Sequence, residues 1–187
     1  MGRLIDLKMV DIAIQAVNIC SSPNLKLTIV GDGPAGDALR DLASSLPNSR
    51  TEFTGWLPQE RVMDYYDMAD VFVLPSVREC GGAVVLEAMA RGVPVIATGW
   101  GGPADYVNEK TGFLITPDSR DSMIHQFARC IDLLAGDPGL RRRLGEAAVQ
   151  RVKNNFTWEK KIERIIKLYS QVLENRHSVV EKSQHAE

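Results

Sequence analysis

The stretch VFVLPSVRECGGAVVLEAMARGVPVIAT, residues 71–98, decides the fold. Two short runs rich in β-branched residues, 71–74 and 94–98, enclose a longer apolar run at 82–91 that has the length of a helix. Gly81 and Gly82 stand where that helix should begin. The strand–helix–strand order predicts two parallel strands joined by a helix.

The same alternation continues on both sides of this stretch. We predict further strands at 25–30, 51–54 and 113–115, and further helices at 6–20, 36–46, 59–68 and 102–108. After about residue 119 the pattern is helical only, with helices expected at 120–135, 138–153 and 157–175. The predicted class is therefore α/β, a Rossmann-like parallel sheet with helices on both faces and a helical C-terminal segment.

Both ends of the predicted domain have a distinct character. A doubly wound unit begins with a strand, whereas this sequence begins with what looks like the turn after one, so we expect the leading strand to be missing from the sheet. Such a sheet has strand edges to cover or pair. Residues 1–175 are expected to form one domain, and the polar residues 176–187 a frayed tail.

Composition excludes several classes of protein. The 187 residues are 44% apolar with a net charge of −2, which is typical of a globular domain and provides no basic field for nucleic acid. Charged residues interrupt every apolar window before the roughly 20 residues that a membrane span needs. The first residues lack a secretory signal, so a cytoplasmic location is predicted. Cys20, Cys80 and Cys130 have neither disulfide-framework nor zinc-site spacing and are expected to be free thiols.

Two glutamates are the leading candidates for chemistry. Glu79 follows the strand at 71–74, at the edge of the sheet where ligands bind in α/β proteins. The adjacent glycines let a ligand approach the backbone, and the helix start behind them favours an anion such as a diphosphate. Glu87 lies further along that helix, and its carboxylate can accept hydrogen bonds from two hydroxyls of a ribose or a hexose.

A purely structural alternative exists for both glutamates. Glu87 could pair with Arg91 one helical turn later, and Glu79 could be a solvated loop charge. However, the helix around Glu87 is apolar on nearly every side, and a carboxylate is costly to bury there without partners. This setting favours the ligand interpretation.

The motif GDGPAG, residues 31–36, spells the G-x-G-x-x-G fingerprint of a dinucleotide site, so an NAD-binding oxidoreductase is an alternative. That fingerprint requires an acidic residue at the end of the next strand, about 20 positions on. The nearest candidate, Glu52, falls near the beginning of its strand, and Pro34 removes a backbone donor from the loop. Both observations disfavour the oxidoreductase.

Taken together, the motifs resemble the C-terminal, donor-binding domain of glycosyltransferase group 1 (family 4) enzymes, which have the GT-B fold. The resemblance covers almost the whole chain. Its most specific part is the pair of glutamates in PSVRECGGAVVLEAMARGVPVIAT, followed by GWGGPADYV and TGFLI. The pieces LKLTIVGDGP, FTGWLP, YYDMADVFVLPS and FTW occur in the order that the family shows.

The resemblance implies a role for each matching residue. Arg3 and Lys8 would hold the donor diphosphate and stabilise the leaving nucleotide, Glu79 would approach the sugar hydroxyls, and Glu87 would bind the ribose. Three further segments would face the donor: Cys80, Gly81, Gly82 and Ala83 beside the sugar and phosphate; Gly55, Trp56 and Leu57 near the base; and Gly31 and Gly33 in the turn facing the nucleotide. The sequence departs from the family at Gly81, where an aromatic residue is frequent, and at Met9, where glycine is frequent.

The function implied is that of the donor-binding half of a retaining, hexosyltransferase-like enzyme. It would transfer a sugar from a nucleotide-diphospho-sugar, without an obligatory metal or other cofactor, because Arg3 and Lys8 supply the positive charge. The resemblance implies that the acceptor domain is not in these 187 residues, and any peripheral membrane contact would belong to that half. We therefore expect weak donor binding and no transfer by this chain alone. A non-catalytic nucleotide-sugar-binding module that works with a separate acceptor subunit is a further alternative.

Overall fold

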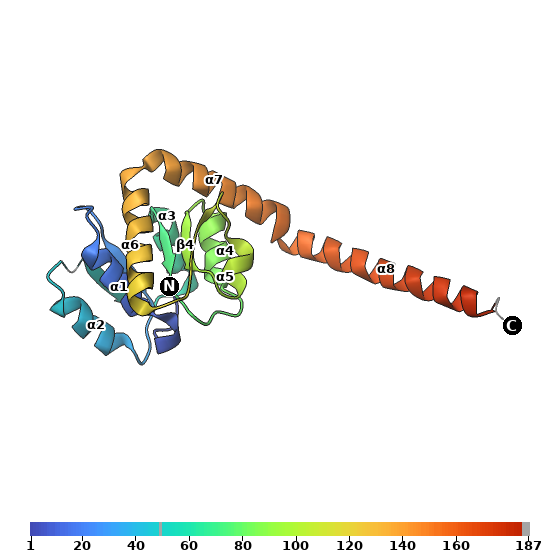
Figure 1. The fold of residues 1–187 in the computed structure, drawn as a ribbon, viewed down its shortest axis with the longest axis horizontal. Helices are drawn as coiled ribbons and strands as arrows, with labels where there is room; N and C mark the ends of the chain where they lie inside the picture. The colour runs from blue at the N-terminus through green and yellow to red at the C-terminus, as the bar shows by residue number, and fades with distance from the viewer. Residues whose placement is uncertain (49, 185–187) are drawn as a thin grey trace. The chain divides into compact units, whose positions relative to one another are not determined.

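The structure, a computed structural model, describes residues 1–48 and 50–184 and alternates strands with helices as far as Ile115 (Figure 1). The elements of this part are η1 (Asp6–Lys8), α1 (Val10–Ile19), β1 (Leu27–Val30), α2 (Gly36–Ser45), β2 (Thr51–Gly55), α3 (Gln59–Met68), β3 (Phe72–Leu74), α4 (Ala83–Ala90), β4 (Val95–Thr98), α5 (Gly102–Tyr106) and β5 (Gly112–Ile115). They are followed by α6 (Arg120–Gly136), α7 (Pro138–Asn155) and α8 (Trp158–Gln184). The predicted α/β class is confirmed.

The strands form two parallel sheets. One has the order β1–β2 and the other the order β3–β4–β5. Leu27 pairs with Thr51 in the first sheet, and Phe72 pairs with Val95 in the second. Within the described residues no strand pairing joins β1 to β3, so the expected single sheet is interrupted between these two strands.

The core lies on both faces of the second sheet. All four residues of β4 are buried, as expected of a strand covered on both sides. Figure 1 shows β4 between α6 on one side and α4 on the other, and both helices contact it. α1 packs against α6, and a second apolar cluster joins α1 to β1 and α2. The candidate residues Glu79 and Cys80 to Ala83 follow the carboxyl end of β3.

The predicted helix at 6–20 is divided in two. η1 is one turn of 3₁₀ helix, and α1 begins at Val10. Between them Met9 has the left-handed conformation, with φ 49° and ψ 36°, and a left-handed residue cannot continue a right-handed helix. Met9 is the non-glycine residue with positive φ among those described. It stands at the position where the family frequently has glycine, which is the residue that adopts this conformation without strain.

We predict that Met9→Gly is more stable than Met9→Ala by about 1 kcal/mol, because only glycine relieves the left-handed strain. Both variants lose the contacts of the Met9 side chain with the apolar core, so the comparison isolates the backbone term. Urea unfolding of the two variants measures the difference. A Met9→Ala variant as stable as Met9→Gly would contradict the strain at this position.

The C-terminal residues differ from the expected tail. The chain divides into a unit of residues Met1–Gln150 and a unit of residues Arg151–Glu187, whereas the sequence placed the boundary after residue 175. α8 continues to Gln184, so residues 176–184 are helical, and the last three residues of the predicted tail lie outside the described part. No helix among the described residues has the length and apolar character needed to cross a membrane.

Candidate functional site

Glu79 lies at the start of α4, in the loop that follows β3. One carboxylate oxygen, Oε1, accepts a hydrogen bond from the backbone N–H of Gly82 at 3.2 Å. The other, Oε2, forms an ion pair with the Nζ of Lys8. The Glu79 side chain is 12% exposed and that of Lys8 26%, so water screens this pair only partly. The alternative of a solvated loop charge is therefore wrong.

Lys8 reaches Glu79 because η1 is tied to the segment after β3. The backbone N–H of Val77 donates to the carbonyl oxygen of Leu7 at 3.2 Å. Lys8 is the last residue of η1 and follows Leu7 directly, so this hydrogen bond fixes the backbone from which the Lys8 side chain extends. The pairing of residues 71 positions apart in sequence is thus a product of the fold.

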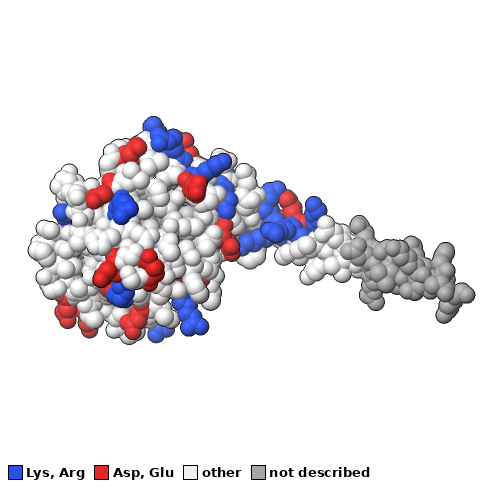
Figure 2. All heavy atoms as spheres, viewed as in Figure 1, with Lys and Arg blue, Asp and Glu red and all other residues white. Residues whose placement is uncertain are grey.

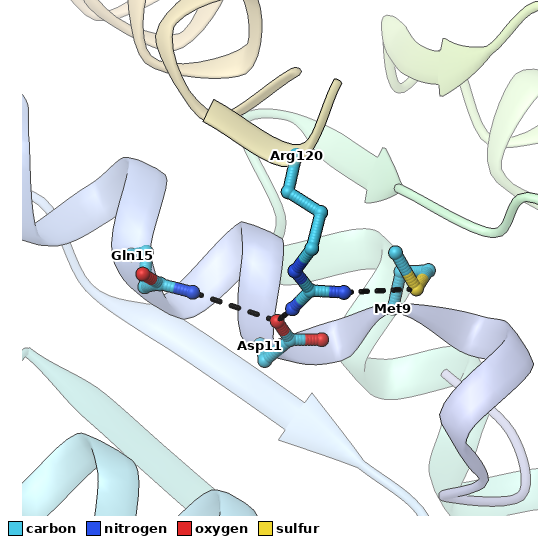
Figure 3. Close-up of polar contacts among 4 residues, drawn as sticks. All are labelled: Met9, Asp11, Gln15 and Arg120. Atoms are coloured by element: carbon cyan, nitrogen blue, oxygen red, sulfur yellow. Dashed lines mark hydrogen bonds and ion pairs between the residues drawn. The ribbon is translucent and has the colours of Figure 1, made fainter. Parts of the chain in front are cut away.

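A second set of contacts holds the turn directly after Lys8 (Figure 3). The guanidinium of Arg120, at the start of α6, forms an ion pair with Asp11 of α1 and lies 3.5 Å from the sulfur of Met9. The amide of Gln15 donates to the same Asp11 carboxylate at 3.5 Å. These contacts connect the first turn of α1 to α6 and so position the backbone that carries Lys8.

Glu87 has a partner that the sequence did not predict. Its Oε2 accepts a hydrogen bond from the hydroxyl of Tyr66, in α3, at 2.9 Å. Tyr66 is fully buried, and burial together with the nearby Glu87 raises the pKa of its phenol, so the hydroxyl stays protonated and donates. Arg91 binds Asp67 instead, with its Nη1 at 2.6 Å from Oδ2. The alternative in which Glu87 pairs with Arg91 is therefore wrong.

The loop before α4 packs against the start of α5 on one side and is exposed to solvent on the other. Gly82 is buried with φ 63°, a conformation that favours glycine. The backbone N–H of Gly102 donates to the carbonyl of Cys80 at 3.2 Å, which ties this loop to the start of α5. Cys80, Gly81 and Ala83 are exposed. The first N–H groups of a helix lack partners within the helix, so this exposed turn can accept an anion.

Gly31 and Gly33 are required by the chain's own backbone. The N–H of Gly2 donates to Val30 and that of Leu4 to Asp32, each at 2.9 Å. A Cβ atom at Gly31 would collide with the carbonyl oxygen of Gly2, and one at Gly33 would collide with that of Leu4. The G-x-G spacing in this loop is thus explained by the close approach of residues 2–4.

The segment near the predicted base contact joins this loop. Gly55 has φ 72°, and its carbonyl accepts from the N–H of Gly31 at 2.9 Å. Trp56 is 75% exposed and Leu57 is partly buried. The structure therefore brings Gly31, Gly33 and Gly55 together, while Lys8, Glu79 and the start of α4 form a separate group.

Residues Met1 to Arg3 lie between these two groups. Arg3 is exposed, its guanidinium has no partner among the described residues, and it lines the same cavity as Lys8. Burial and the charge of Lys8 lower the pKa of the Met1 amino group to about 6, whereas Glu87 acts in the opposite direction. The Met1 amino group is thus close enough to Lys8 and Glu87 for their charges to change its pKa.

The sequence analysis did not identify two further residues at this edge of the sheet. Ser76 follows β3 and Thr98 ends β4; both are buried, and their hydroxyl oxygens have no partner in the described part of the chain. A hydroxyl residue at the end of an apolar strand or within two residues of it is the signal that could have identified them. No cluster of three or more metal-ligating side chains occurs among the described residues.

Residues 1–151 match the family described as Glycosyl transferases group 1. The chain belongs to this family. An uncharacterized glycosyltransferase of Methanocaldococcus jannaschii is 32% identical over 176 residues, which are 92% of this chain and 44% of that protein. This group 1 chain thus spans less than half the length of that relative. Because the chain belongs to a glycosyltransferase family, the NAD-binding oxidoreductase alternative is wrong.

Solved structures show the same fold. The C-terminal domain of a group 1 glycosyltransferase from Francisella tularensis is similar in fold to this chain, with a TM-score of 0.74 at 24% identity over 84% of each chain. HepE of Anabaena, solved in complex with UDP and glucose, has a TM-score of 0.69 at 25% identity over 91% of this chain and 47% of its own. The predicted resemblance to a group 1, GT-B domain is confirmed.

Proposed function

We propose that this chain is the donor-binding half of a retaining glycosyltransferase and takes a nucleotide-diphospho-sugar. The observation that carries the proposal is the Lys8–Glu79 pair at the exposed N-terminal turn of α4. A cation, a carboxylate and free helix N–H groups at the carboxyl edge of a parallel sheet form a suitable set for a sugar diphosphate. The complex of HepE with UDP and glucose supports this ligand class.

Lys8 would bind the diphosphate while it keeps its contact with Glu79. An ammonium group has three donors, and Glu79 uses one of them. The other two can donate to phosphate oxygens, as can the exposed guanidinium of Arg3. When the bond between the sugar and the diphosphate breaks, negative charge grows on the leaving nucleotide, and these fixed cations stabilise it.

The two glutamates would contact different parts of the donor. The Glu79 carboxylate is held by Lys8 and by the Gly82 N–H, so its orientation is fixed, and it would approach the sugar hydroxyls. Among the described residues Glu87 binds Tyr66 through Oε2 alone, so its Oε1 would be available to a ribose hydroxyl. In this arrangement Tyr66 orients Glu87 without touching the ligand.

Backbone groups would complete the donor site. The Gly82 N–H is already bound to Glu79, so the N–H groups of Cys80, Gly81 and Ala83 would face the sugar and phosphate. Gly55, Trp56 and Leu57 would lie near the base, with Gly31 and Gly33 in the turn behind them, because Gly31 is bonded to Gly55.

No obligatory metal is part of the proposal, because Lys8 and Arg3 supply the charge that a metal ion would otherwise supply. The proposed enzyme is cytoplasmic, and its acceptor site belongs to a separate domain or subunit. Transfer with retention then requires that domain to bring the acceptor to the face of the sugar from which the phosphate departs.

The test is to incubate the purified chain with UDP-, GDP- and ADP-glucose and to follow binding by calorimetry and nucleotide release by chromatography. We expect binding of at least one of these donors and no sustained transfer to added acceptors. Sustained transfer by the chain alone would contradict the division into halves. No binding of any of the three donors or of free UDP would contradict the donor site.

A further inference from the structure

Trp100 is an exposed aromatic residue that has no role in the donor site proposed above. It lies in the loop that joins β4 to α5, and it is 53% exposed. Trp56 and Trp100 are the exposed aromatic residues in the described part of residues 1–150. Ligand pockets are lined mainly by apolar and aromatic side chains, and an indole offers a large apolar surface. Its exposure shows that Trp100 is not a core residue and is free to contact a ligand.

Hydrogen bonds hold the backbone of Trp100 in place. The N–H of Gly99 donates to the carbonyl of Ile115 in β5, and the N–H of Trp100 donates to the carbonyl of Thr98 in β4, each at 2.8 Å. The next residue, Gly101, has φ 60°, a conformation that favours glycine. The indole is therefore carried by a fixed loop, and a ligand would not have to order this backbone on binding.

The loop of Trp100 runs beside the loop that carries Glu79. A Cβ atom at Gly101 would collide with the carbonyl oxygen of Glu79, and one at Gly102 would collide with that of Gly81. The helices that follow the two loops, α5 and α4, also contact each other (Figure 1). The backbone of Trp100 is thus one residue away from a direct contact with Glu79.

The exposed turn before α4 has no apolar wall of its own. Cys80 and Gly81 are both exposed, and among the described residues no atom beyond the chain neighbours lies within 4 Å of the position of a Cβ at Gly81. A hexose held there by Glu79 and by backbone N–H groups would have its hydroxyls bound, but the C–H groups of its ring would remain in water. Burial of those groups against an apolar surface is favourable. The loop of Trp100 borders this open turn.

We propose that the indole of Trp100 packs against the C–H groups of the transferred hexose and forms the apolar wall of the donor-sugar pocket. This contact presupposes the proposed donor function and adds to it a residue that selects the nucleotide-sugar over the free nucleotide. The flat apolar face of an indole suits the C–H face of a pyranose ring. Trp100 would therefore contribute affinity for the sugar and little for the diphosphate.

The base end of the donor is a less suitable partner for Trp100. In the proposed site the base lies near Trp56, in the segment whose Gly55 is bonded to Gly31. That segment is separate from the group that contains Glu79 and the start of α4, and the loop of Trp100 contacts the second group. The two exposed tryptophans would therefore contact opposite ends of the donor.

The test compares nucleotide-sugar and nucleotide binding in Trp100→Ala and Trp100→Phe by calorimetry. The ligands are UDP-, GDP- and ADP-glucose, each measured beside its free nucleoside diphosphate. For the donor that the unaltered chain binds, we expect Trp100→Ala to lower the affinity about fivefold to tenfold, and the affinity for the free diphosphate to change less than about twofold. Trp100→Phe keeps an aromatic ring and should retain most of the affinity for the nucleotide-sugar.

Two further variants are the controls. Trp56→Ala should weaken the binding of nucleotide-sugar and nucleotide by the same factor, because the base is common to both. Met68→Ala removes a side chain that is 69% exposed at the end of α3, before the amino end of β3, and should change neither affinity. Thermal unfolding of each variant checks that the fold is kept.

Two results would overturn the contact. An unchanged ratio of the two affinities in Trp100→Ala contradicts it, because Trp100 then either touches no part of the donor or acts on the nucleotide alone. In that case the donor site itself still stands, since the nucleotide binds. No binding of any of the six ligands by the unaltered chain would instead contradict the proposed donor site, and the contact of Trp100 with it.

Discussion

Lys8→Ala is expected to weaken UDP binding about 100-fold. A hydrogen bond between charged groups contributes about 1.5–3 kcal/mol, and about 1.4 kcal/mol corresponds to a tenfold change in affinity. The variant also leaves the Glu79 carboxylate, 12% exposed, without its cation beside the diphosphate. Loss of attraction and gain of repulsion act together, so this substitution should have the largest effect on binding.

Lys26→Ala is the matched control. Lys26 also pairs with a glutamate, Glu52, but the two side chains are 68% and 51% exposed, and such surface pairs contribute little. UDP affinity should stay unchanged in this variant. The double variant Lys8→Ala, Glu79→Gln should recover part of the lost affinity, because it removes the repelling carboxylate. Wild-type affinity in Lys8→Ala, measured by calorimetry, would contradict the role of Lys8.

Glu87→Ala is expected to weaken UDP binding about tenfold or more while the melting temperature falls by only a few degrees. The Tyr66 hydroxyl, which loses its carboxylate partner, can still donate to the carbonyl of Val84, 3.3 Å away. The fold therefore keeps a hydrogen bond for this buried group, whereas the ligand loses its acceptor. Calorimetry with UDP and thermal unfolding measure the two effects.

Tyr66→Phe separates the two roles of this pair. It removes the hydroxyl that holds Glu87 but leaves the carboxylate, so we expect a larger loss of stability than in Glu87→Ala and a smaller loss of UDP affinity. An equal loss of affinity and stability in Glu87→Ala would instead indicate that Glu87 is a structural partner of Tyr66 and does not bind ribose.

The local pattern predicted most of the helices and strands. α3 begins and ends where the periodicity placed it, and α4 and β4 differ from the prediction by one residue at each changed end. The break at Met9 was not predicted, because nothing in the apolar spacing shows that a methionine adopts a left-handed conformation. The gap between β1 and β3 depends on which strands pair, and that is decided by contacts far apart in sequence.

The candidate site shows the same limit. Lys8 and Glu79 are 71 residues apart, and Tyr66 and Glu87 are 21 apart, so no spacing rule links them. The rule for helical neighbours offered Arg91 as an alternative partner for Glu87, but Arg91 pairs with Asp67 of α3. The candidate residues came from the resemblance to the family, whereas their partners came only from the fold.

The structure explains the glycines of the loop at residues 31–36 differently from the dinucleotide fingerprint. The spacing of Gly31 and Gly33 fits a dinucleotide fingerprint, but the close approach of Gly2 and Leu4 explains why no side chain fits there. A glycine motif permits a close approach to the backbone, but it does not indicate whether a ligand or another segment of the same chain approaches.

The central claim is that the donor binds at the start of α4, beside Lys8. Titration of the ¹⁵N-labelled chain with UDP-glucose, followed by NMR, tests it most directly. We predict that the largest shift changes occur at the amides of Cys80, Gly81 and Ala83, and that NAD at the same concentration leaves them unchanged. Changes confined to residues 31–36, or a response to NAD alone, would contradict it.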